Sequence, residues 1–246
     1  MLKKLLAGLA IAVLCLGPAS VLVAVGVLMN PAANASCTTG SSLQVGPIPD
    51  SLDVTTKDGV TFTLNKTQLT HAATIITVGG QTEGIDTRRV TIALMAALTE
   101  STLRQLANTG TYPESGDYPN DGDGSDHDSL GLFQMRPQSG WGTVAELMDT
   151  TYQARAFYGG PTGPNYPSPR GLLDIPGWQS MDMGEAAQAV EVSAYPDRYQ
   201  NYQPVAEAIL TALTTPSKPS GSGETGTVAE TSRIVFPLPE GSWTKT

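Results

Sequence analysis

The sequence DTRRVTIALMAALTESTL, residues 86–103, is apolar on almost every side between Val90 and Leu98. A helix on a protein surface shows only one apolar stripe, so this segment predicts a helix buried in the centre of a domain. Asp86 and Thr87 are typical of the start of such a helix. Glu100 then stands at its far end, an ionisable residue directly after a long apolar run.

Glu100 permits two interpretations. A carboxyl group in apolar surroundings holds its proton tightly, because burial disfavours the anion, and it can then act as a general acid near neutral pH. The alternative is a solvated helix-end carboxylate that pairs with Arg104 four residues later. Taken alone, a glutamate at a helix end is more often of the second kind, so the functional interpretation depends on other motifs.

The rest of the chain predicts a mainly α fold with a possible small β-hairpin. Polar residues 65–68 are suited to cap a helix that runs through Val78 and ends at Gly79 and Gly80. Two β-prone runs within residues 51–65 flank a turn at Asp58 and Gly59. Further helices are expected over residues 143–157, 183–192 and 202–213, with loops over 110–129 and 159–170.

The N-terminus contains Lys3 and Lys4 followed by an uncharged, mainly apolar run over residues 5–29. Such a run is long enough to span a bilayer, and the two lysines predict that the N-terminus lies inside. Ala33-Asn34-Ala35 also matches a signal-peptide cleavage site. Residues 1–35 are therefore predicted to be a membrane anchor or a signal peptide. The remainder would be an extracytoplasmic domain held at the membrane, or a secreted or cell-wall protein after cleavage near Ala35.

Composition excludes several classes of function. The net charge is −9, with 14 basic residues against 23 acidic ones, which argues against nucleic-acid binding. Two cysteines and two histidines are too few for a disulfide framework or a zinc cluster, so we expect no cofactor.

The loop over residues 117–128 is rich in acidic residues. Asp121, Asp123 and Asp126 are weak candidates for a calcium site, although Leu132 stands where an EF-hand loop has glutamate. A second catalytic carboxylate at Asp126 or Asp128 and a simple solvated loop are the alternatives.

Three motifs resemble those of a known family. Glu100-Ser101 followed by GLFQM at residues 131–135 resembles the lysozyme-like superfamily, in particular the soluble lytic transglycosylase and goose-type lysozyme group. The sequence is still more similar to a Gram-positive cell-wall subgroup, through DSLGLFQ at 128–134, Trp141-Gly142 and SAYPD at 193–197. Pro196 replaces the asparagine that is usual after the tyrosine of the third motif.

The resemblance covers residues 65–213 and implies a lysozyme-like domain that cleaves peptidoglycan glycan strands, as a lytic transglycosylase or a muramidase. It implies that Glu100 is the catalytic acid and base. The substrate-binding residues that it implies are Ser101, Phe133, Gln134, Met135 and Tyr195. The alternative functions are a catalytically weak wall-binding module and a component of an envelope secretion or conjugation machine.

The flanking segments are expected to be less regular. Residues 36–64 are predicted to be a spacer with the possible hairpin, and residues 214–246 a flexible linker and tail. The tail contains RIVFPLPEGSWTKT, residues 233–246, and resembles the first strand of a lysostaphin-type zinc metallopeptidase domain. The zinc ligands of such a domain would lie further on. This pattern suggests a truncated or divided two-domain wall hydrolase.

Overall fold

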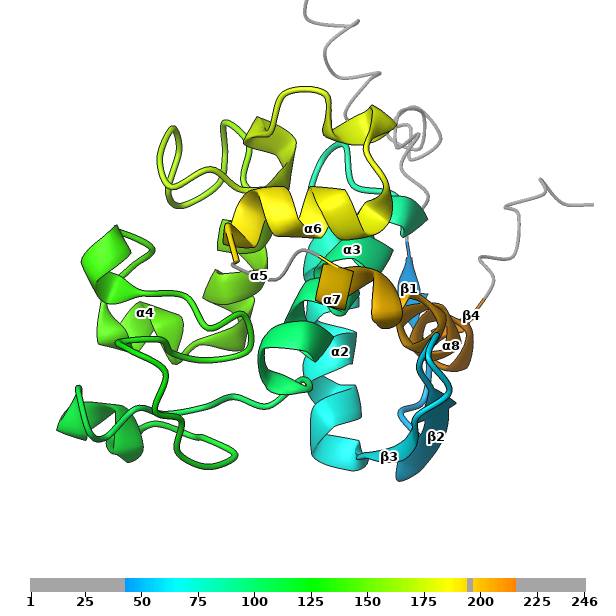
Figure 1. Ribbon diagram of the computed structural model, residues 1–246, viewed down its shortest axis with the longest axis horizontal. Helices are drawn as coiled ribbons and strands as arrows, with labels where there is room; N and C mark the ends of the chain where they lie inside the picture. The colour runs from blue at the N-terminus through cyan, green and yellow to red at the C-terminus, as the bar shows by residue number, and fades with distance from the viewer. Residues whose placement is uncertain (1–42, 194–196, 216–246) are drawn as a thin grey trace, which may run out of the picture.

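Helix α3, Thr87–Ser101, lies at the centre of the folded body (Figure 1). Every residue from Val90 to Leu98 is buried, and helices α2, α6 and α8 pack around it. Asp86 caps its first turn by accepting a hydrogen bond from the Arg89 amide at 3.0 Å. The prediction of a buried central helix that begins after Asp86 is confirmed.

The computed structural model describes residues 43–193 and 197–215. The predicted anchor or signal peptide, Tyr195 and the tail beyond residue 215 therefore lie outside the described residues. Within the described residues, no helix is long and apolar enough to cross a membrane.

The fold is mainly helical, as predicted. The other helices are α2 (Lys66–Gln81), α4 (Val144–Leu147), α5 (Thr150–Tyr158), α6 (Met183–Glu191), α7 (Asp197–Asn201) and α8 (Gln203–Leu213). Four 3-10 turns cover Pro113–Asp117, Pro137–Ser139, Leu172–Asp174 and Trp178–Ser180. The single helix predicted over 143–157 is in fact α4 and α5, because Asp149 ends the first segment and caps the second through the Thr151 amide at 2.8 Å. Helix α7 was not predicted.

Helix α2 starts where the sequence predicted and ends later. Asn65 and Gln68 form a reciprocal capping box at its first turn. The helix does not stop at Gly79 and Gly80 but continues to Gln81. A Cβ atom on Gly79 would lie 2.7 Å from Val90 Cγ2 and 2.8 Å from the Tyr158 hydroxyl. Gly79 is thus required for the close approach of three helices and does not terminate α2.

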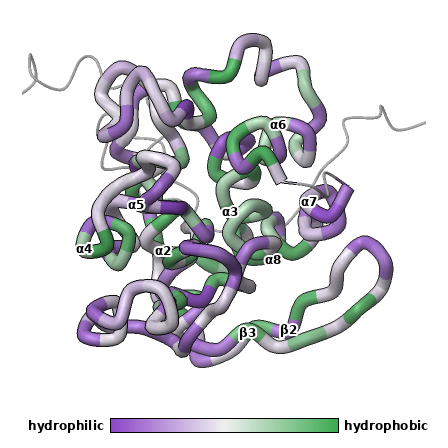
Figure 2. The backbone as a smooth tube through the Cα atoms, turned by 60° about the vertical axis from the view of Figure 1, so that its left-hand side comes forward, coloured by the Kyte–Doolittle hydropathy of each residue, from purple (hydrophilic) through white to green (hydrophobic). Residues whose placement is uncertain are grey.

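The predicted hairpin is present. Strand β2 (Ser51–Thr55) pairs antiparallel with β3 (Thr61–Asn65), and its turn contains Gly59 at a φ of 90°. Figure 2 shows the hairpin projecting beyond the helices. Val54 and Leu64 on its inner face are nevertheless buried in the common core, so the hairpin belongs to the folded body and not to a spacer.

Two short strands close the body where the described chain begins and ends. Strand β1 (Gln44–Val45) pairs antiparallel with β4 (Thr214–Thr215) next to the end of α8. The pairing extends the folded unit beyond the range 65–213 on both sides, because residues from both flanks take part in its hydrogen bonding.

Candidate active site

Glu100 lies in the last turn of α3 and is half-buried. The Tyr199 hydroxyl of α7 donates a hydrogen bond to Glu100 Oε1. Burial raises the pKa of the Glu100 carboxyl above its ordinary value of 4.5, while the Tyr199 hydrogen bond and the charge of Arg198 lower it and the charge of Asp126 raises it. Burial is the largest of these effects, so the group keeps its proton to a higher pH than a solvated glutamate does.

A second buried carboxyl group stands beside the first. Glu191 is the last residue of α6, and its Oε1 atom is buried with no hydrogen-bond partner among the described residues. Desolvation raises the pKa of Glu191 well above 4.5, and the negative charge of Glu100 raises it further. Burial therefore favours the neutral form of Glu191. Glu191 was not predicted from the sequence, because no local pattern in α6 indicates that its end meets the end of α3.

Tyr199 interacts with both carboxyl groups. Its side chain is fully buried, and the pKa of its hydroxyl is raised by burial, by the charge of Glu191 and by its hydrogen bond to Glu100. It is thus a permanent hydrogen-bond donor over the physiological pH range. Tyr195, the tyrosine predicted for the site, lies outside the described residues, and Tyr199, two residues beyond the SAYPD motif, was not predicted.

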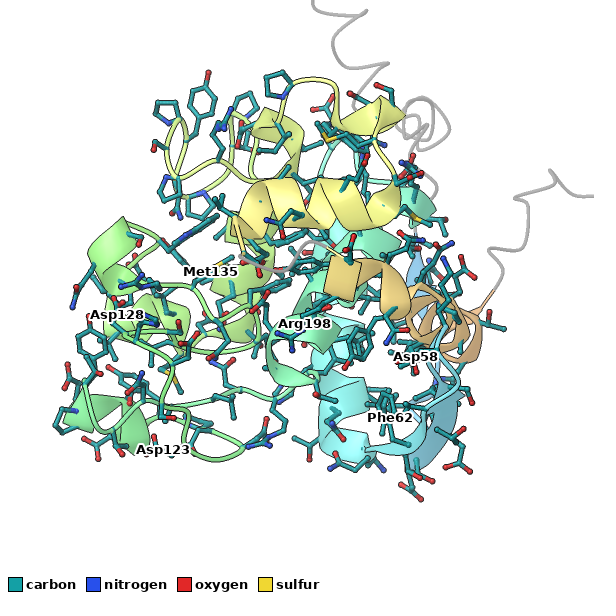
Figure 3. All side chains as sticks on the ribbon, viewed as in Figure 1. Asp58, Phe62, Asp123, Asp128, Met135 and Arg198 are labelled. Atoms are coloured by element: carbon teal, nitrogen blue, oxygen red, sulfur yellow. The ribbon has the colours of Figure 1, made fainter. Side chains whose placement is uncertain are left out.

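The tip of the hairpin holds α7 in position. The Lys57 amide donates to the Asn201 carbonyl oxygen at 2.9 Å, and the Asp58 amide donates to Asn201 Oδ1 at 3.0 Å. These bonds tie the turn between β2 and β3 to the end of the helix that carries Arg198 and Tyr199. Figure 3 shows Asp58 and Arg198 on these neighbouring elements.

Unusual backbone conformations surround the two carboxyl groups. Thr102 and Leu103 follow Glu100 with φ angles of 56° and 59°, and Val192 follows Glu191 at 52°. A β-branched residue such as Val192 rarely adopts a positive φ, and here its side chain is also 79% exposed. Such strain tends to gather at functional sites.

The segment GLFQM lies between the end of α3 and a polar pocket. Gly131 has a φ of 75°, and a Cβ on it would lie 1.8 Å from Gln153 Nε2. Gln153 in turn accepts a hydrogen bond from the Phe133 amide at 3.1 Å and donates to the Leu147 carbonyl oxygen at 2.6 Å. The glycine of the motif is therefore needed to seat this loop on a buried amide side chain.

A pocket of about 400 Å³ opens beside Glu191. The residues that line it include Gln134, Met135, Arg136, Trp141, Arg170 and Glu191. Figure 3 places Met135 near the end of α6. Glu100 does not line this pocket itself, so the pocket adjoins the Glu100 carboxyl through Glu191.

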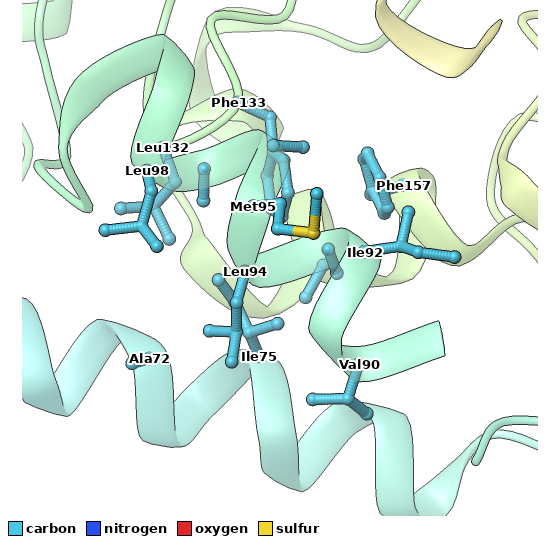
Figure 4. Close-up of a cluster of buried hydrophobic side chains, with 14 of the residues drawn as sticks. Ala72, Ile75, Val90, Ile92, Leu94, Met95, Leu98, Leu132, Phe133 and Phe157 are labelled. Carbon is cyan, nitrogen blue, oxygen red and sulfur yellow. The ribbon is translucent and has the colours of Figure 1, made fainter. Parts of the chain in front are cut away.

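The remaining predicted substrate-binding residues divide into two groups. Gln134 and Met135 line the pocket, as their predicted role requires. Ser101 and Phe133 do not. The Ser101 hydroxyl is buried and donates to the Leu132 carbonyl oxygen at 2.8 Å, which joins the end of α3 to the GLFQM loop. Phe133 is fully buried and stacks on Phe157 with ring centroids 4.7 Å apart (Figure 4). Both side chains are buried and hold the GLFQM loop against the rest of the core.

The acidic loop does not bring its carboxylates together. Asp121 accepts from His71 Nε2 and from the Gln105 amide, both at 2.8 Å. Asp123 accepts from the Thr109 amide at 2.8 Å, and Asp126 contacts His127 Nδ1 at 2.8 Å. Within residues 43–193 and 197–215, no group of three or more histidine, cysteine or acidic side chains is placed to hold a metal ion. The three calcium candidates therefore face separate partners.

No protein-family model matches the chain, and no curated protein matches it in sequence.

Proposed function

We propose that the chain cleaves the glycosidic bonds of peptidoglycan glycan strands with Glu100 as the general acid. The observation that carries this proposal is the Glu100 carboxyl itself. It ends a buried helix, its pKa is raised by burial, and Tyr199 fixes its orientation beside a polar pocket. A carboxylic acid that keeps its proton to higher pH than a solvated glutamate and is held in one orientation suits glycoside cleavage, which needs a proton on the leaving oxygen.

The hydrogen bond from Tyr199 determines which oxygen of Glu100 carries the proton that is transferred. Tyr199 donates to Oε1, so the transferable proton is carried by Oε2 of Glu100. That proton passes to the glycosidic oxygen as the bond from the sugar C1 breaks and an oxocarbenium-like centre develops. The Glu100 carboxylate then accepts a proton from the group that attacks C1. Attack by the 6-hydroxyl of the same sugar gives a 1,6-anhydro end, and attack by water gives a reducing end.

The substrate class rests on the motifs and on the arrangement of their residues. Glu100 and the GLFQM segment resemble the lytic transglycosylase and goose-type lysozyme group, and Ser101 joins these two motifs physically. Gln134 and Met135 line the pocket that adjoins the carboxyl pair. The predicted N-terminal anchor or signal peptide would place such an enzyme outside the membrane, where peptidoglycan lies.

The test uses the full chain, purified as the native protein and as Glu100→Gln, with isolated peptidoglycan. We expect the native protein to release glycan fragments that are identified by mass spectrometry, and Glu100→Gln to release them at least about a hundredfold more slowly. Fragments lighter by one water indicate transglycosylation, and reducing ends indicate hydrolysis. Binding of both proteins to the wall without release of fragments would contradict the enzymatic proposal and favour a wall-binding module.

A further inference from the structure

The pocket beside Glu191 contains one positive charge without compensation. Arg136 donates through Nε to Asp128, a carboxylate that is 3% exposed, and this pair is neutral as a unit. Burial raises the pKa of the Glu191 carboxyl, which favours its neutral form. Arg170 is exposed and forms no hydrogen bond or ion pair with any other described residue. Its guanidinium group is therefore available to a ligand.

Hydrogen bonds hold the loops that carry Trp141 and Arg170 in place. The Trp141 carbonyl oxygen accepts hydrogen bonds from the Tyr152 hydroxyl at 3.0 Å and from Asn165 Nδ2 at 2.8 Å. At the other end of the loop, Asp174 accepts from the amides of Gly160 and Gly171. These bonds fix both edges of the segment that carries Arg170. The half-buried Trp141 ring adds a flat apolar surface to the pocket.

The ligand chemistry follows from this combination. A guanidinium group is suited to bind a carboxylate through two parallel hydrogen bonds, and an indole ring is suited to the apolar face of a sugar. The chain as a whole carries a charge of −9, so it repels anions in general and needs a local cation to hold one. Peptidoglycan carries carboxylates on its lactyl groups where the peptide is absent, and on its peptide stems where it is present.

We propose that this pocket is a subsite for a carboxylate-bearing unit of the glycan, in which Arg170 binds the carboxylate and Trp141 contacts the sugar. This inference rests on the proposed function and specifies which part of the substrate lies beside the cleavage point. Arg170 is a specificity-determining residue in this arrangement and takes no part in proton transfer.

The experiment measures equilibrium binding to the full chain that carries Glu100→Gln, so that no ligand is consumed. The probes are a muramic-acid-containing tetrasaccharide with free lactyl carboxylates, the same tetrasaccharide with peptide stems, and an uncharged N-acetylglucosamine tetrasaccharide. Adding Arg170→Gln should weaken binding of a carboxylate probe about tenfold and change binding of the uncharged probe less than about twofold. Selective loss with the first probe identifies the lactyl group, and selective loss with the second identifies the stem.

Arg155→Gln is the matched control. Arg155 is an exposed arginine of α5 that lines a different pocket, so its removal changes the net charge equally and should affect none of the probes. Equal loss with charged and uncharged probes, or no loss with any of them, would overturn the proposed subsite. Release of fragments by the native protein is measured in parallel. Fragment release without a selective Arg170 effect refutes only the subsite, whereas a selective effect without fragment release refutes only the cleavage reaction.

Discussion

Acidic side chains gather in two regions of this molecule, and the surroundings of the carboxyl groups differ between them. In the loop over residues 117–128, hydrogen bonds hold the pKa of Asp123 below its ordinary range, with the Thr109 hydroxyl as the main cause. At the junction of α3, α6 and α7, burial raises the pKa of both Glu100 and Glu191. Figure 3 shows Asp123 and Asp128 on the loop side, well away from Arg198 on α7.

The difference shows that the number of carboxyl groups in a segment does not locate an acid catalyst. In the loop, hydrogen bonds from the Thr109 hydroxyl and amide lower the pKa of Asp123, and hydrogen bonds from Gln138 and Arg136 outweigh the effect of burial and lower the pKa of Asp128. The junction carboxyl groups lie where water is excluded and have few donors, which stabilises their neutral form. A carboxyl group whose pKa is raised keeps its proton to higher pH and is better suited to act as a general acid, so the sparser region is the candidate site.

The largest expected effect comes from removing the acid of the junction. Glu100→Gln keeps the shape of the side chain and removes the transferable proton, so the rate of fragment release should fall by about 10²- to 10⁴-fold. Asp123→Asn is the matched change in the loop and should leave the rate close to that of the native protein. Fragment release is followed by mass spectrometry over time. Similar losses in the two variants would remove the distinction between the regions.

The next largest effect is expected on the free energy of unfolding, from a substitution in the loop over residues 117–128. Asp128 is 3% exposed, pairs with Arg136 and accepts from the Gln138 amide at 3.0 Å. Asp128→Ala should lower the free energy of unfolding by about 2–3 kcal/mol, because both partners lose their acceptor. Urea unfolding measures the change, with the exposed Asp123→Ala as a control that should shift the midpoint far less. An unchanged midpoint for Asp128→Ala would show that this pair does not stabilise the fold.

Tyr199→Phe should have an intermediate effect on catalysis. The hydroxyl of Tyr199 lowers the pKa of Glu100, so its removal should raise that pKa and move the alkaline limb of the pH–rate profile to higher pH. Loss of the orienting bond should also lower the rate about tenfold. Tyr202→Phe, a half-buried tyrosine next to α7, serves as the control and should leave the profile in place. A shift of the alkaline limb to lower pH would contradict the assigned hydrogen bond.

Glu191→Gln should change how the free energy of unfolding depends on pH. The folded-state pKa of Glu191 lies above the unfolded value, so its favourable contribution is complete below about pH 4.5 and is lost as the pH rises through the folded-state pKa. In Glu191→Gln the side chain does not ionise, so this loss does not occur. The free energy of unfolding of the variant, compared with that of the native protein, should therefore increase as the pH rises above about 4.5. Thermal unfolding at a series of pH values tests this expectation. Glu185→Gln, at the other end of α6, is the control for removing a carboxyl group from the same helix.

The smallest effect is expected for Asp126, a loop residue whose charge acts on Glu100. The charge of Asp126 raises the pKa of Glu100, so Asp126→Asn should move the alkaline limb of the rate profile slightly to lower pH. Because Asp126 is exposed, the maximal rate should change less than about twofold. A loss of a hundredfold or more would instead identify Asp126 as a second catalytic carboxylate, which was one of the alternatives for this loop.

Several local features could be predicted from the sequence. The apolar run after Asp86 specified a buried helix, the capping residues Asn65 and Gln68 specified the start of α2, and Asp58-Gly59 specified a hairpin turn. These features depend on neighbours in the chain, so their physical causes are visible in the sequence. For the same reason Glu100 could be selected, since its apolar neighbours precede it directly.

The tertiary structure alone decided which residues accompany Glu100. Glu191 and Tyr199 lie about ninety to a hundred positions further along the chain, and only the packing of α6 and α7 on α3 brings them to its carboxyl group. The same packing gave Gly79 and Phe133 roles that local patterns did not predict, because burial depends on segments distant in sequence. The pKa of a carboxyl group follows its surroundings, and those surroundings exist only once the chain has folded.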